Sequence, residues 1–105
     1  MRVALLSPIW PPARERLAAR HEVVAALGPG VRAAVVRSGV RLDRAAFGIA
    51  PDLLLVVRAG AGTDAIDLAC AAERGIRVVV VPASSRSVAE HALGLLLSLA
   101  WPLIR

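Results

Sequence analysis

The chain has 105 residues, of which 57% are hydrophobic, and its 13 basic and 8 acidic side chains give a formal net charge of +5 at pH 7. This length suits one domain with one core, and charged residues interrupt every apolar run before the roughly 20 residues needed to cross a bilayer. The basic residues are all arginines scattered singly along the chain, so we expect one domain over residues 1–105 with neither a membrane nor a nucleic-acid partner.

Short apolar runs bounded by turn residues predict five strands. These runs span residues 2–6, 22–24, 33–36, 53–57 and 78–81. The segments between and after them predict helices over residues 12–20, 43–49, 65–74 and 88–100. Strands that are apolar on both faces and alternate with helices indicate an α/β fold, with a parallel sheet covered on both sides.

Two segments depart from a regular alternation of strands and helices. Residues 25–32 are too few for an ordinary crossover helix between parallel strands, so we expect this crossover to be shortened. The segment 88–100 is apolar around almost its whole circumference and must therefore be covered on two sides. We expect a homodimer formed through this segment, or a further domain, to cover the second side.

Few residues outside the glycine-rich loop are candidates for catalysis or for metal binding. The apolar start of the chain has no small-residue cleavage site, which indicates a first strand and a cytoplasmic protein rather than a signal peptide. Cys70 is the single cysteine and is interpreted as a buried packing residue, and His21 as a surface residue. No metal-ligand spacing and no Ser, His and Asp motif occurs, so we predict neither a metal site nor catalytic residues.

The stretch RAGAGTDAID, residues 58–67, follows an apolar run and precedes a predicted helix. Gly60, Gly62 and Ala65 satisfy the glycine pattern of dinucleotide-binding loops. In such domains an acidic residue near the end of the next strand holds the ribose hydroxyls, but the stretch VPASSR has no acid. Its Arg86 could instead bind the 2′-phosphate of NADP, so an NADP site stays open as an interpretation. A second interpretation is a tight turn, with Asp64 as the N-cap of the next helix.

A third interpretation comes from four sequence blocks that occur in this order: VVRS (35–38), RAGAGTDAID (58–67), AAERGIRVVVVP (71–82) and SVAEHALGLLLSLA (87–100). Together they resemble the N-terminal, substrate-binding part of the D-isomer-specific 2-hydroxyacid dehydrogenases, with the phosphoglycerate dehydrogenases as the most similar branch. The resemblance implies a flavodoxin-like, doubly wound sheet of five parallel strands in the order 2-1-3-4-5, with helices on both faces. It also implies that residues 87–105 lead towards a separate nucleotide-binding domain.

The resemblance further implies which residues bind the substrate, a small 2-hydroxy or 2-oxo acid. They are Arg37, Ser38, Ala59, Gly60, Ala61 and Gly62. In the family, NAD and the catalytic Arg, Glu and His belong to the part of the enzyme that follows the matched blocks. We therefore expect no cofactor in this chain, and we predict the substrate-binding half of an NAD-dependent oxidoreductase that is inactive by itself. The alternative is a free-standing flavodoxin-like module without enzymatic activity, held as a homodimer.

Overall fold

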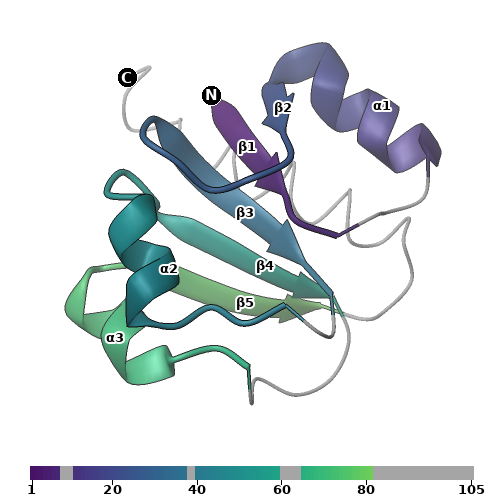
Figure 1. Ribbon diagram of the computed structural model, residues 1–105. Coiled ribbons are helices and arrows are strands. Elements are labelled where there is room, and N and C mark those ends of the chain that lie inside the picture. Colours follow the sequence, from purple (N-terminus) through teal and green to yellow (C-terminus); the bar gives the residue numbers. More distant parts are fainter. Residues whose placement is uncertain (8–10, 38–39, 60–64, 82–105) are drawn as a thin grey trace, which may run out of the picture.

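A computed structural model describes residues 1–7, 11–37, 40–59 and 65–81. This part of the chain forms a parallel five-stranded sheet in the order β2-β1-β3-β4-β5, which confirms the predicted fold (Figure 1). The strands are β1 (Arg2–Leu5), β2 (Glu22–Val24), β3 (Val31–Val36), β4 (Leu55–Ala59) and β5 (Arg77–Val81). The helices are α1 (Pro11–Arg20), α2 (Arg44–Ile49) and α3 (Leu68–Glu73). The predicted helix over residues 88–100 lies outside the described residues.

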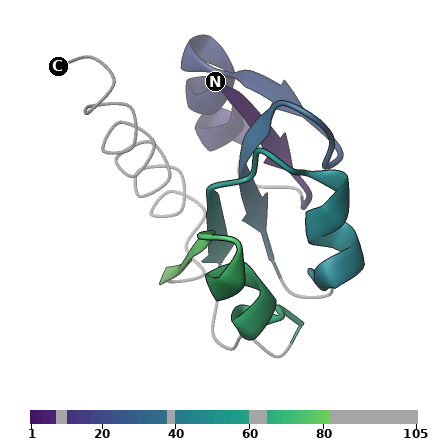
Figure 2. The ribbon, with the colours of Figure 1, turned by 90° about the vertical axis from the view of Figure 1, so that its left-hand side faces the viewer.

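The helices lie on opposite faces of the sheet, with α1 on one side and α2 and α3 next to each other on the other (Figures 1 and 2). On the first face, Leu17 of α1 is buried together with Val3 and other strand side chains. On the second face, Phe47 of α2 and Cys70 of α3 belong to a larger buried cluster. Successive side chains of a strand point to opposite faces, so β1, β3 and β4 supply both clusters and are apolar along most of their length.

The crossover from β2 to β3 contains no helix, as the short spacing predicted. Polar side chains hold this connection at three points. Arg2 pairs with Glu22 at 2.8 Å and donates a hydrogen bond to the carbonyl of Pro29 at 3.2 Å, and the Asp52 carboxylate accepts from the Gly30 N–H at 2.8 Å. Gly30 has a φ of +83°, which suits glycine because it lacks a Cβ. Specific hydrogen bonds thus replace the packing that a crossover helix would provide.

Helix α3 begins three residues later than predicted, and its N-cap is Asp67 rather than Asp64. The Asp67 carboxylate accepts a hydrogen bond from the Cys70 N–H at 2.9 Å. A β-bridge between Leu42 and Ile66 holds the preceding residues in an extended conformation, because the Leu42 N–H donates to the carbonyl of Ala65 and the Asp67 N–H donates to Leu42, each at 2.8 Å. The chain therefore becomes free to turn into a helix only after Ile66.

Helices α2 and α3 support each other on their shared face of the sheet. Arg74, the C-cap of α3, donates a hydrogen bond to the Phe47 carbonyl at 3.0 Å. Gly75 follows with a φ of +71° and brings the chain into β5. Among the helices of the described segments, none has the length and apolar character that a membrane span requires.

Candidate functional site

The strand order reverses between β1 and β3, since the chain moves outward to β2 after the first of these strands and towards β5 after the second. In open α/β sheets, ligands bind outside the carboxyl ends of the strands at such a switch point. Two hydrogen bonds join the two strand ends in the described part of the chain: the Leu6 N–H donates to the Val35 carbonyl at 3.0 Å, and the Arg37 N–H donates to the Ser7 hydroxyl oxygen at 3.1 Å. Ser7 has a relative exposure of 8%. The switch point is thus fixed by contacts between residues that are distant in the sequence.

Arg37 and Ala59 are the two predicted binding residues that the structure describes. Arg37 directly follows β3, and its side chain is exposed. Ala59 ends the neighbouring strand β4, and the register pairs Val36 with Arg58, which places both predicted residues at the same carboxyl edge of the sheet. Ser38, Gly60, Ala61 and Gly62 lie outside the described residues.

Arg58 is a residue of this edge that the sequence analysis did not single out. It lies within β4 and is buried, with a relative exposure of 9%. The alternation along the strand places its side chain on the same face as Val56, the face that α2 and α3 cover. Arg58 takes part in an interaction within the protein. An arginine at the end of an apolar strand, directly before a glycine-rich loop, is the signal that could have identified it.

The start of α3 is not a free anion-binding site. Asp67 places its own carboxylate at this helix end and accepts from the Cys70 amide. A negative side chain at a helix N-terminus satisfies the unpaired amides there and interacts favourably with the helix dipole. The amide of Cys70 at this helix end is therefore already paired within the chain.

The strands before and after the glycine-rich stretch, β4 and β5, lie away from the point where the strand order reverses. A dinucleotide binds at the crevice where the strand order reverses, whereas β4 and β5 follow one another on the same side of that reversal. The sequence after β5 also lacks the acid expected to hold the ribose hydroxyls. The arrangement therefore does not support an NAD or NADP site at this loop.

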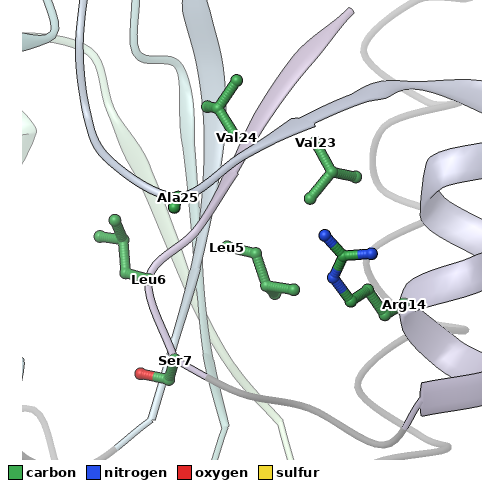
Figure 3. A pocket seen from close by; sticks show the side chains of 7 residues that line it. All are labelled: Leu5, Leu6, Ser7, Arg14, Val23, Val24 and Ala25. Atoms are coloured by element: carbon green, nitrogen blue, oxygen red, sulfur yellow. The ribbon is translucent and has the colours of Figure 1, made fainter.

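A hollow of about 510 Å³ opens beside the switch point, between the carboxyl ends of β1 and β2 and the first turn of α1 (Figure 3). Its walls combine apolar side chains of the two strands with the Ser7 hydroxyl and the Arg14 guanidinium. Arg37 and Ala59 are not among its lining residues. The hollow is therefore a second feature of this edge of the sheet, on the β2 side of β1.

The remaining candidate residues suggest packing rather than chemistry. Cys70 is buried, as predicted. His21 is half-buried rather than a fully exposed surface residue, and its ring nitrogens are buried without a hydrogen-bond partner in the described part of the chain. Burial lowers the pKa of His21 below its usual value, and the positive charges of the N-terminus and Arg20 lower it further. Within the described residues, no group of three or more His, Cys, Asp or Glu side chains could hold a metal ion.

Most of the sequence matches a known protein family. The model of the D-isomer specific 2-hydroxyacid dehydrogenase catalytic domain matches residues 12–95. The chain belongs to this family. The match covers both predicted binding loops and the strands β2 to β5.

Relatives in the family are dehydrogenases and reductases of small acids. The chain is 44% identical over 80 residues to D-3-phosphoglycerate dehydrogenase of Mycobacterium tuberculosis, a match that covers 75% of this chain and 15% of the relative. It is 41% identical over 78 residues to hydroxypyruvate reductase of Thermotoga maritima, with coverage of 73% and 26%. The chain thus spans about a seventh to a quarter of the length of these relatives.

Solved structures show the same fold. A dehydrogenase from Rhizobium meliloti superposes with a TM-score of 0.63 and 28% identity, covering 74% of this chain and 31% of the other. The pyruvate reductase of Chlamydomonas reinhardtii gives a TM-score of 0.61 and 25% identity, covering 99% of this chain and 37% of the other. Both agree with the α/β architecture of the 2-hydroxyacid dehydrogenase family.

Proposed function

We propose that this chain forms the substrate-binding part of an NAD-dependent D-2-hydroxyacid dehydrogenase of the phosphoglycerate dehydrogenase kind. The observation that carries the proposal is the placement of Arg37 at the switch point of the sheet. Its backbone is held by the Ser7 hydroxyl, while its guanidinium remains exposed beside the end of β4. An arginine on a fixed backbone can meet a carboxylate through charge-assisted hydrogen bonds at a small cost in conformational entropy.

The proposed substrate is a short 2-hydroxy or 2-oxo acid. Support comes from the relatives, whose names refer to phosphoglycerate, hydroxypyruvate and pyruvate. These acids share a three-carbon chain with a carboxylate next to an oxygenated carbon. In our proposal, Arg37 and the backbone amides of residues 60–62 bind this carboxylate, and Ser38 and Ala59 line the same side of the cleft.

We further propose that the 105 residues do not catalyse the reaction by themselves. Bound NAD supplies the hydride-accepting ring in this kind of reaction, and a base must stand beside the substrate carbon. The proposal is supported by the strand order, since β4 and β5 lie away from the switch point where a dinucleotide binds, and by the family resemblance, which assigns no catalytic base to this part of the sequence. Oxidation of NADH by the purified chain with pyruvate or hydroxypyruvate would refute this part of the proposal.

An amide NMR titration of the isotope-labelled chain with 3-phosphoglycerate and, separately, with pyruvate tests the binding site. We expect saturable shifts at Arg37 and at residues 59–62. Arg37→Ala should weaken binding by about 1 to 3 kcal/mol, which corresponds to roughly 5- to 150-fold, because a charge-assisted hydrogen bond is lost.

Arg32→Ala is the matched control, because Arg32 is an exposed arginine near the opposite end of the same strand. It removes the same charge from the protein and should leave the affinity unchanged. Equal weakening by the two substitutions would indicate a general charge effect and would refute the assigned site. Saturable shifts at residues 59–62 with NAD would likewise contradict the assignment of this loop to the acid.

A further inference from the structure

The hollow beside α1 lies where strand β2 ends while the chain of the neighbouring strand β1 continues. Strand β2 has three residues, and its last pair in the sheet joins Val24 to Ala4. The chain then turns away at Ala25, whereas β1 continues through Leu5 towards Ser7 (Figure 3). The ends of the two strands therefore diverge, and about 510 Å³ remains between them and α1.

Five of the seven described residues that line this hollow are apolar, and they come from both faces of the sheet. Leu5 and Val23 are partly buried hydrophobic residues that pack against the cluster on the α1 side. Leu6 and Val24 pack in the same way against the cluster on the other side. A ligand with a hydrocarbon body beside α1 would remove Leu5 and Val23 from water, which is favourable at about 25 cal/mol per Å² of apolar area.

Arg14, an exposed residue of α1, gives the hollow a positive charge. It precedes Leu17, the fully buried residue of α1, by three positions and therefore lies on the same helix face. Figure 3 shows its guanidinium extending from α1 towards Val23 and Leu5. In the segments that the structure describes, no acidic side chain pairs with Arg14, and none lines the hollow.

Ser7 lies at the edge of the hollow and is held by the end of β3. Its relative exposure is 8%, and its hydroxyl oxygen accepts the hydrogen bond from the Arg37 N–H. Figure 3 shows this hydroxyl on the opposite side of β1 from the Arg14 guanidinium, so Arg14 is the group that can bind an anion in the hollow.

We propose that this hollow is a binding site for a small organic anion with an apolar body. The anionic head binds to Arg14, and the hydrocarbon part packs against Leu5 and Val23 on the α1 side of the strands. The volume lies within the range of about 300 to 1,000 Å³ that is usual for small-molecule sites. The site differs from the proposed substrate cleft, because it lies on the β2 side of β1 and requires no oxygen on the second carbon of the ligand.

The test is an amide NMR titration of the full chain with hexanoate at pH 7.5. Hexanoate has the anionic head and the hydrocarbon body that the site requires but lacks the 2-hydroxy or 2-oxo group of a dehydrogenase substrate. Acetate lacks the hydrocarbon body, and hexan-1-ol lacks the charge. Hexyl phosphate distinguishes a phosphate ligand from a carboxylate ligand. We expect saturable shifts at Leu5, Arg14 and Val23 with hexanoate or hexyl phosphate, and at least tenfold weaker binding of acetate and hexan-1-ol.

Arg14→Gln should weaken the binding of hexanoate at least tenfold, because the charged donor is lost. Arg20→Gln is the control, because this exposed arginine of the same helix is not part of the hollow. Shifts that persist unchanged in Arg14→Gln, or equally tight binding of hexan-1-ol, would overturn the proposal. Arg37→Ala should leave hexanoate binding intact, so the failure of either proposed site can be recognised independently of the other.

Discussion

Replacing Asp67 by alanine should destabilise the protein through a single lost helix cap. The Asp67 carboxylate accepts a hydrogen bond from the Cys70 N–H at 2.9 Å, and its own backbone N–H donates to Leu42 at 2.8 Å. Alanine keeps the backbone bond and removes the carboxylate. Because α3 has six residues and buries Cys70 and Ala71, fraying of its first turn would also loosen their packing in the core.

The expected loss in the free energy of unfolding is about 1 kcal/mol, within the range of 0.5 to 2 measured for caps of this type. In a domain of this size, that corresponds to a decrease of roughly 4 to 8 °C in the melting temperature. Urea unfolding followed by far-ultraviolet circular dichroism measures the change, and the m-value should stay constant because the same surface is exposed on unfolding. Asp67→Asn keeps an oxygen acceptor but loses the charge, so its stability should lie between those of the wild type and Asp67→Ala.

Asp64→Ala is the comparison that decides between the structure and the local sequence pattern. The glycine-loop pattern favours Asp64 as the cap, whereas the structure starts α3 after Asp67. We expect Asp64→Ala to change the stability by no more than about 0.5 kcal/mol, as is usual for substitutions away from such features. A loss with Asp64→Ala as large as that with Asp67→Ala would refute our account of this helix start.

Further substitutions test the core, the turn after α3, the titration of His21 and the assembly. Phe47→Ala should lower the free energy of unfolding by about 3 to 5 kcal/mol, because Phe47 is fully buried; a loss below 1 kcal/mol would contradict its place in the core. Gly75→Ala meets no atom within 4 Å but forces alanine into a positive φ, so urea unfolding should show a loss of about 1 to 2 kcal/mol. The lowered pKa of His21 means that the unfolded chain binds the proton more readily, so stability should be retained above about pH 6.5 and lost as the pH falls below it. His21→Gln should flatten this pH dependence in unfolding curves, and an unchanged curve would contradict it. If residues 88–100 form the proposed homodimer contact, Leu95→Glu with Leu99→Glu should halve the mass measured by light scattering or unfold the chain, and an unaltered mass would count against the dimer.

Local sequence patterns predicted several features that the structure confirms. The apolar runs at β1, β2 and β5 lie within two residues of the observed strands, because an apolar segment between turn residues has few other ways to bury its side chains. The eight residues from 25 to 32 excluded an ordinary crossover helix, which the structure also lacks. The predicted helix over residues 43–49 is observed as α2, with Asp43 as its N-cap, accepting from the Ala46 N–H at 3.0 Å.

Other boundaries depended on partners that are distant in the sequence. Strand β4 runs from Leu55 to Ala59 instead of from residue 53 to 57, because its register follows β3 and β5, while Leu53 forms a turn with Ala50. The strand thus carries Arg58 into a buried position that its charge alone did not suggest. In the same way, pairing of Leu42 with Ile66 delays the start of α3.

The sequence by itself determined the class of fold, the shortened crossover and the family, because periodicity, turn residues and motif blocks are local properties. The tertiary structure decided which of these residues share an edge of the sheet. Ser7 and Arg37 meet across 30 positions, and Arg14 of α1 comes to lie beside the ends of β1 and β2. Such contacts depend on strand order and on where each strand ends, and the pairing between distant segments that fixes both is not encoded in any single stretch of the chain.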